Sequence, residues 1–208
     1  MKILPAALIL ISYISSAGSL PVYPGPIEQG DGDWLVYDNG TAQWTTWDGR
    51  YRGVWFNIYD FVPGWMGCEI SETELWFYHH VSYPWDISEF TMELWNGGST
   101  GPEVFLFDST ATALHYAPAN IEISQEVIAE SNFWCLQNTE LSSGGWPSIL
   151  ADHGTPGSIY HSYFSDTLSG VWQPFDRAGP SDFFVRIYAD FLYENFQRTT
   201  WGEIKTVF

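Results

Sequence analysis

Glu69, Glu72 and Glu74 form the densest group of acidic side chains in this sequence. A glycoside hydrolase uses two carboxyl groups, one as an acid and one as a base or nucleophile, on either side of the bond that it breaks. Glu72 and Glu74 would share one face of a strand, which an enzyme of this kind could use. The Glu-x-Asp-x-Glu pattern of sandwich-fold hydrolases is absent, however. We therefore interpret the three acids as a solvated strand edge, where charge discourages pairing with another chain.

Two other groupings of polar residues could support nucleophilic or metal chemistry. Asp152 and His153, together with the serines, supply the residue types of a nucleophilic triad, but no Gly-x-Ser-x-Gly elbow is present. We interpret this pair as part of a polar turn. His79 and His80 are adjacent on a predicted strand, so their rings point to opposite faces and cannot bind one metal ion together. We expect one ring to be packed and the other to be exposed.

Oxygen-bearing side chains crowd the first predicted turns, and such hard ligands are the ones that calcium prefers. They are Asp31, Asp33, Asp38, Asn39 and Asp48. Asp-Gly and Asn-Gly pairs are also ordinary turn residues, and the full EF-hand pattern is missing. We therefore predict no cofactor and no metal site, with calcium at the rim of a sandwich as the alternative.

Tryptophan is abundant, with 12 residues among 208. The C–H faces of sugar rings stack on Trp and Tyr, although any one Trp is more often part of the core. Tryptophans in turn-like surroundings are expected to be more exposed than Trp55, Trp76 and Trp134, which lie within predicted strands. The candidate ligand-binding residues are Trp44, Trp47, Trp65, Trp85 and Trp146.

The chain is strongly acidic, with 25 Asp and Glu against 7 Lys and Arg and a formal net charge of −18 at pH 7. Nucleic-acid binding requires a basic stripe, and anionic lipid headgroups would be repelled. We therefore exclude nucleic acid as a partner. The acidity favours solubility outside the cell, while a salt-rich habitat or divalent cations are alternative explanations.

Residues 1–19 have the three parts of a secretory signal peptide. Lys2 precedes an apolar run over 3–14, and small residues follow it. We expect cleavage after Ala17 or Ser19. The apolar run is shorter than the roughly 20 residues that span a bilayer. We therefore expect a secreted or cell-surface protein with no integral membrane segment after cleavage.

Cys68 and Cys135 are the only two cysteines. In an oxidising compartment an even number favours one disulfide, which would contribute roughly 4 kcal/mol to stability if the strands let the two residues meet. The alternative is a pair of buried thiols, since Cys packs like a small hydrophobic residue. Neither cysteine has a His at the spacing of a zinc site.

Residues 34–190 are predicted to form one all-β domain, an antiparallel β-sandwich of jelly-roll type with little helix. Successive side chains of the segment 52–59 would point to opposite faces, and both faces carry aromatic residues, which predicts a central strand. The segment 89–95 has one apolar and one polar face. Gly, Pro and Asn punctuate the chain between such segments. Further strands are predicted over 73–81, 104–108, 120–127, 132–137, 148–151, 158–164 and 182–189.

A series of short strand and turn motifs runs through this domain. They are Tyr37-Asp38-Asn39-Gly40, Gly53-Val54-Trp55-Phe56, Gly101-Pro102-Glu103-Val104, Ser162-Tyr163 with Trp172, and Phe183-Phe184-Val185-Arg186-Ile187. Their order resembles jelly-roll modules of exported bacterial proteins. The resemblance implies a β-sandwich of carbohydrate-binding or accessory type, often with no assigned activity.

The two ends of the mature chain are expected to lie outside the sandwich. Residues 20–33 form a Pro/Gly-rich arm, and residues 191–208 form a tail. In the tail, Thr200 and Glu203 fit a capping box, which favours a short amphipathic helix. The Trp-Gly-Glu-Ile-Lys string also resembles a C-terminal tag of some exported bacterial proteins, which would imply recognition by a sorting or attachment system. The alternative is a tail that docks on the sandwich.

Three classes of function are compatible with these features, because sandwiches host all of them. We expect a secreted, non-catalytic module that binds a glycan or a cell-surface polymer. The first alternative is a structural or self-associating surface protein, and the second is a polysaccharide hydrolase or lyase.

Overall fold

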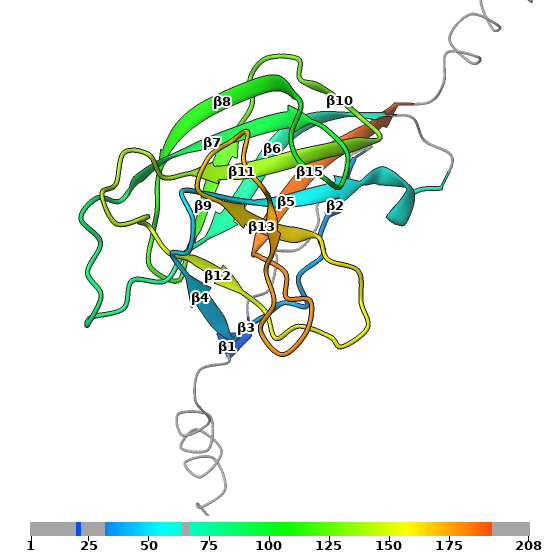
Figure 1. Ribbon diagram of the computed structural model, residues 1–208. Coiled ribbons are helices and arrows are strands. Elements are labelled where there is room, and N and C mark those ends of the chain that lie inside the picture. Colours follow the sequence, from blue (N-terminus) through cyan, green and yellow to red (C-terminus); the bar gives the residue numbers. More distant parts are fainter. Residues whose placement is uncertain (1–19, 22–31, 64–66, 193–208) are drawn as a thin grey trace, which may run out of the picture.

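The computed structural model describes residues 20–21, 32–63 and 67–192, which form two antiparallel β-sheets packed as a sandwich (Figure 1). Within these ranges there is no α-helix, and one short 3-10 turn, η1 (Ile58–Asp60), is present. The predicted all-β antiparallel sandwich with little helix is therefore confirmed. This part of the chain contains no helix with the length and apolar character needed to cross a membrane. The predicted signal peptide, most of the arm and residues 193–208 lie outside the described residues.

One of the two sheets has six strands. In spatial order they are β14 (Gln173–Pro174), β13 (Ser162–Ser165), β5 (Tyr51–Asn57), β11 (Asn132–Asn138), β7 (Glu89–Asn96) and β8 (Val104–Thr112). The strand predicted over 52–59 corresponds to β5. It pairs with β13 on one edge and β11 on the other, so the prediction that it is central is confirmed.

The other sheet has five strands arranged around β6. They are β10 (Ile128–Glu130), β9 (Pro118–Glu122), β6 (Gly67–Trp76), β15 (Val185–Leu192) and β2 (Asp33–Leu35). β9 and β10 pair with successive parts of one edge of β6, and β15 pairs with the other edge. Two short ladders complete the fold, namely β1 (Leu20–Pro21) with β3 (Thr41–Ala42) and β4 (Trp44–Thr46) with β12 (Ile149–Ala151).

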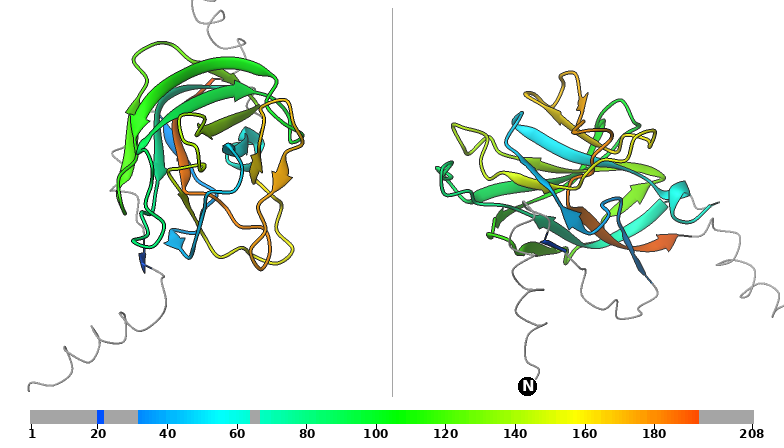
Figure 2. Two further views of the ribbon diagram at one scale, coloured as in Figure 1. Left: turned by 60° about the vertical axis from the view of Figure 1, so that its left-hand side comes forward. Right: turned by 90° about the horizontal axis from the view of Figure 1, so that it is seen from below.

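The two curved sheets enclose one apolar interior (Figure 2). On β7, Phe90, Met92 and Leu94 are fully buried in this interior, whereas Glu89 on the opposite face is exposed. Successive side chains of a strand point to opposite faces, so the period of two in the sequence identifies the residues between the sheets.

A second apolar layer covers the outer face of the six-stranded sheet around Trp134. The Trp134 ring lies 5.0 Å from Trp172 and 5.3 Å from Tyr163, measured between ring centroids. Its indole N–H donates to the carbonyl oxygen of Gly98 at 2.9 Å, and the side chain is fully buried. Trp134 is therefore a packing residue, as expected for a tryptophan within a strand.

Arg186 on β15 is fully buried between two carboxylates. Its Nε and Nη2 atoms donate to the two carboxylate oxygens of Asp38 at 2.9 and 2.8 Å, and Nη1 donates to Glu74 at 2.9 Å. The interpretation of Glu74 as part of a solvated strand edge is wrong, because β6 pairs on both edges and Glu74 is buried beside Arg186. Its partner is 112 positions away in the sequence, so local patterning gives no sign of the pair.

Cys68 on β6 and Cys135 on β11 are free and fully buried, so the predicted disulfide is not present. The two residues belong to opposite sheets. Packed sheets stand about 10 Å apart, whereas a disulfide joins Cα atoms less than about 7 Å apart. Burial raises the pKa of the Cys68 thiol to about 12 and also raises that of Cys135. The structure thus corresponds to the alternative of two buried thiols.

Candidate functional site

The loop between β6 and β7 is rich in aromatic rings. Seven of the ten residues 76–85 are aromatic or histidine. β6 ends at Trp76, so the expectation that His79 and His80 lie on a strand is wrong. His79 is exposed and His80 is half-buried. A tight turn, in which the Tyr83 N–H donates to the carbonyl oxygen of His80 at 2.9 Å, shapes the loop that carries these rings.

Arg52 on β5 holds the two backbone segments that carry Trp47 and Trp146. Its buried guanidinium donates to the carbonyl oxygens on either side of Trp146 at 2.6 and 3.3 Å, and to the carbonyl oxygen preceding Trp47 at 3.5 Å. Burial lowers the pKa of Arg52 to about 9, so the side chain remains charged at neutral pH. One buried cation therefore positions both tryptophans.

Gly145 allows these two segments to approach closely. Its φ angle of 76° lies in the left-handed region that favours glycine. A Cβ atom at this position would lie 2.7 Å from the carbonyl oxygen of Trp47. The turn predicted from Ser143-Gly144-Gly145 thus has a second role, because it brings Trp146 against Trp47.

Rings from four separate segments contact one another in series and form a surface that we call the aromatic row. Its members are Trp146, Trp47, Tyr83, His80, Tyr78, His115 and Tyr116. Centroids of adjacent rings are 4.8 to 5.9 Å apart. The row is accessible to solvent, since Trp47 is 36% exposed and Tyr83 is 51% exposed.

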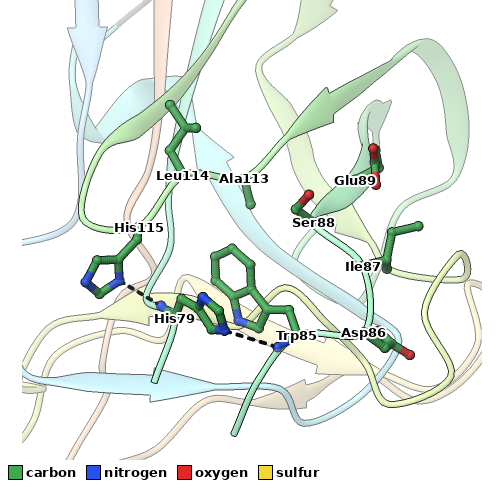
Figure 3. A pocket seen from close by; sticks show the side chains of 9 residues that line it. All are labelled: His79, Trp85, Asp86, Ile87, Ser88, Glu89, Ala113, Leu114 and His115. Carbon is green, nitrogen blue, oxygen red and sulfur yellow. Dashed lines mark hydrogen bonds between the residues drawn. The ribbon is translucent and has the colours of Figure 1, made fainter. Parts of the chain in front are cut away.

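A pocket of about 540 Å³, which we call the histidine pocket, adjoins the row at His115 (Figure 3). Figure 3 shows the rings of His79, Trp85 and His115 on one side of the pocket and Glu89 on the other. The Trp85 ring stacks on His79 with centroids 4.8 Å apart, and its indole N–H donates to Ser148 at 3.2 Å. Because His115 belongs to both features, the pocket and the row are continuous.

Asp86 at the edge of this pocket ties the loop of residues 77–88 to the turn that carries Trp146. Its carboxylate accepts hydrogen bonds from the hydroxyls of Ser142 and Ser143, both at 2.7 Å, and from the Ser143 N–H at 2.9 Å. The hydrogen bond from Ser142, followed by those from Ser143, holds the pKa of Asp86 below its ordinary range. The carboxylate of Asp86 therefore fixes the loop of residues 77–88 to Ser142 and Ser143.

A smaller hollow of about 130 Å³ is lined by Tyr78, Trp44, Tyr116 and Leu150, among others. Trp44 is 37% exposed, and its ring stacks on that of His153 with centroids 6.4 Å apart. Because Tyr78 and Tyr116 line the hollow and also belong to the aromatic row, the hollow extends the same surface.

Asp152 and His153 have separate surroundings. Asp152 is buried and accepts the backbone N–H groups of Asp182 at 2.8 Å and of Asn39 at 3.1 Å. Burial raises the pKa of Asp152 to about 6. Asp152 therefore holds the backbone at Asn39 and Asp182 in place, while the exposed His153 contacts Trp44.

Four of the five candidate tryptophans meet on this continuous surface. Trp47 and Trp146 contact each other in the aromatic row, Trp85 lines the histidine pocket, and Trp44 lines the smaller hollow. Trp65 lies outside the described residues. Trp47, Trp85 and Trp146 lie outside strands, as predicted, whereas the turn-like surroundings expected for Trp44 are wrong because it begins β4 and pairs with Ala151. The sequence did not show that these residues would converge.

Sequence reasoning missed the other rings of the site. Tyr78 lies in the segment 73–81, for which the sequence predicts a strand, and Tyr83 lies just after it, so neither is among the predicted site residues. The concentration of aromatic and histidine residues over 76–85 was the signal that could have identified them. His115 and Tyr116, which lie between β8 and β9, had no comparable signal.

Arginine side chains engage two of the oxygen-bearing residues of the first turns. Asp38 is paired with Arg186, and Asp48 is paired with Arg177 at 3.0 Å. Among the described residues, no group of three or more His, Cys, Asp or Glu side chains could hold a metal ion. Asp31 lies outside those residues. Two of the carboxylates proposed as calcium ligands therefore form ion pairs with arginine instead.

The antiparallel sandwich agrees with the resemblance to jelly-roll modules at the level of overall architecture. Comparison of the chain with protein-family models, with curated proteins and with solved structures finds no match.

Proposed function

We propose that the protein is a non-catalytic binding module that holds a glycan, or a surface polymer with similar rings, along the aromatic row. The observation that carries this proposal is the convergence of Trp44, Trp47, Trp85 and Trp146 on one continuous, partly exposed surface. Tryptophans that serve only to pack the core would not need to meet on the surface. Trp134, for example, is fully buried in a separate apolar cluster.

The dimensions of the site suit a chain of ring-shaped units. Exposed aromatic rings offer flat apolar faces, and polar groups beside them can orient a ligand. The histidine pocket lies within the range of roughly 300–1,000 Å³ that small-ligand sites occupy. Asp86, Ser88 and Glu89 add polar atoms to its lining. The row would bind by stacking, and the pocket would hold one part of the ligand.

The charges near the site favour a neutral ligand. Among the described residues the exposed cationic side chains are Arg50 and Arg177, and neither lines the row or the pocket. Asp86 and Glu89 place negative charge beside the rings. An anionic polymer would therefore be repelled, and we expect a neutral polysaccharide.

The carboxylates of the pocket favour binding over hydrolysis. A glycosidase needs one carboxyl group as an acid and a second as a base or nucleophile. The carboxylate of Asp86 already accepts hydrogen bonds from the Ser142 and Ser143 hydroxyls. Glu89 is then the one other carboxylate in the pocket lining that could act as an acid or a base. This arrangement supports a module without catalytic activity.

We expect the purified chain to be retained on at least one insoluble neutral polysaccharide, and Trp47→Ala to weaken binding about tenfold or more, which corresponds to roughly 1.4 kcal/mol. The loss follows from removal of a ring that contacts both Trp146 and Tyr83. A panel of cellulose, xylan, chitin and mixed β-glucans, followed by calorimetry with soluble oligomers, measures the effect.

Phe105→Ala is the matched control, because Phe105 is 49% exposed but lies on β8 outside the aromatic row. Retention of this variant should equal that of the unchanged protein. Equal losses for Phe105→Ala and Trp47→Ala would contradict a site at the row. A lack of retention on every polymer and oligomer would refute the glycan proposal.

A second candidate function, self-association, is favoured by one feature of β8. This strand ends the six-stranded sheet, and its exposed side chains include Val104 and Phe105, at 58% and 49% exposure. A free strand edge can pair with another chain. Asp108 lies at the centre of β8, so symmetric antiparallel pairing would place it opposite Asp108 of a second copy.

We therefore expect Asp108→Asn to increase self-association if β8 is an assembly edge, because the variant removes repulsion between like charges on paired strands. Light scattering over a concentration series would show a larger mass for Asp108→Asn than for the unchanged protein. Glu103→Gln, a charge change just before β8, is the control. Identical masses for all three proteins would leave this second function without support.

A further inference from the structure

Histidine is concentrated beside the aromatic row. The chain has five histidines, and three of them, His79, His80 and His115, lie in the row or in the histidine pocket. His153 stacks on Trp44 beside the smaller hollow. The surface that we propose as a binding site therefore contains or adjoins four of the five imidazole side chains of the chain.

Each of the three histidines accepts a hydrogen bond from a backbone N–H of the same loop. His115 Nδ1 accepts from the N–H of His79 at 3.0 Å, and His80 Nδ1 accepts from the N–H of Ser82 at 3.0 Å. His79 Nε2 accepts from the N–H of Trp85 at 3.4 Å. Figure 3 shows the bonds that join His115 to His79 and His79 to Trp85.

These bonds exist only when the imidazoles are neutral. A neutral imidazole has one acceptor nitrogen, whereas both nitrogens of the protonated ring are donors. Protonation would therefore turn N–H groups toward backbone N–H groups at three places in one loop. Imidazole is the ordinary side chain that can gain a proton between pH 8 and pH 5, so acidification is the condition that tests this change.

The groups around the three imidazoles offer little compensation for a positive charge. Tyr78 contacts His80 and His115, Tyr83 contacts His80, and Tyr116 contacts His115. Trp85 covers one face of His79. These neighbours are neutral rings.

Two carboxylates, those of Asp86 and Glu89, also line the histidine pocket. Asp86 is engaged by Ser142 and Ser143. Among the described residues, the ion pairs that involve histidine are both made by His161, and none is made by His79, His80 or His115. Protonation of the three rings would also place like charges close together.

We propose that neutral His79, His80 and His115 form a pH-sensitive clasp, which holds the loop of residues 77–88 in its binding shape and releases it on acidification. Tyr83 belongs to the row and Trp85 to the pocket, so release of the loop displaces a ring from each. The clasp itself depends only on the hydrogen bonds. Its consequence for ligand binding rests on the proposed function.

The test uses substitutions that keep each acceptor but cannot be protonated. In His80→Asn and His115→Asn the amide oxygen takes the place of Nδ1, and in His79→Gln it takes the place of Nε2. Amide hydrogen exchange of the full chain, expressed as protection relative to unstructured peptide, is measured at about pH 7.5 and about pH 5.5. Retention on the polysaccharide identified above is measured under the same two conditions.

In the unchanged protein, we expect protection of the amides of His79, Ser82 and Trp85 to fall roughly tenfold at the lower pH, with ligand retention falling in parallel. The triple variant should show the same protection at both pH values, whatever its affinity. His153→Asn is the control for the exchange measurement, because His153 accepts no hydrogen bond from this loop, and protection of the same three amides should fall in it as in the unchanged protein.

The exchange measurement separates failure of the clasp from failure of the proposed function, because it needs no ligand. If these amides are equally protected at both pH values in the protein without substitutions, the clasp is overturned. A triple variant that loses protection at the lower pH as strongly as the unchanged protein would also overturn it. If the triple variant does not fold, His80→Asn alone must abolish the response of the Ser82 amide. Loss of protection without loss of retention would overturn the regulatory role.

Discussion

Replacing Arg186 with Met is expected to lower the free energy of unfolding by about 3–5 kcal/mol, because it leaves two buried carboxylates without their cation. Asp38 and Glu74 would lose three hydrogen bonds of 2.8 to 2.9 Å and would remain in a region that excludes water. The guanidinium also lies over the ring of Phe184, with Cζ 5.4 Å from the ring centroid. Urea denaturation followed by tryptophan fluorescence measures the change.

Arg177→Met is the control for this substitution. Arg177 also pairs with an aspartate, Asp48 at 3.0 Å, but the two side chains are 45% and 48% exposed. Exposed ion pairs contribute no more than about 1 kcal/mol, so the control should lose little stability. Equal losses for the two variants would show that burial of the Arg186 group does not govern its contribution.

Replacing Trp134 with Ala is expected to cost about 3–5 kcal/mol of stability, the usual range for removal of a large buried side chain. The substitution opens a cavity between Trp172 and Tyr163 and removes the donor to the carbonyl oxygen of Gly98. Trp47→Ala should cost less stability than Trp134→Ala, because Trp47 is 36% exposed whereas Trp134 is fully buried. Urea denaturation of both variants measures the difference.

The comparison of Trp134 with Trp47 separates two populations of tryptophan. If Trp134 packs and Trp47 binds, the first substitution reduces stability and the second reduces retention on polysaccharide. Trp134→Phe, which keeps a buried ring, should recover part of the lost stability. A large loss of stability on Trp47→Ala would contradict a binding role and would make Trp47 part of the scaffold.

The strands could be predicted from the sequence because alternation is a local property. Phe90, Met92 and Leu94 repeat every second residue, and β7 buries all three. The end of β6 could not be predicted in the same way. Trp76 pairs with Pro118 of β9, and beyond it Phe77 makes only isolated bridges. The place where that strand stops depends on its partners.

The candidate site was predicted in part for the same reason. Trp47, Trp85 and Trp146 were identified because turn residues surround them, which is a local signal. Their convergence depends on Arg52, which reaches from β5 to the segments beside Trp47 and Trp146. Tyr78 belongs to the loop and not to the strand because β6 ends at Trp76.

The sequence by itself determined the all-β class and the residues that face the core, and it predicted that Trp47, Trp85 and Trp146 lie outside strands, because each of these features depends on neighbours a few positions away. Tertiary structure alone decided three other features. It buried Glu74 against Arg186, kept Cys68 and Cys135 apart on opposite sheets, and assembled the aromatic row from four segments. These depend on contacts between strands that are distant in the sequence, and the sheet pairings that create them are not encoded in any local pattern.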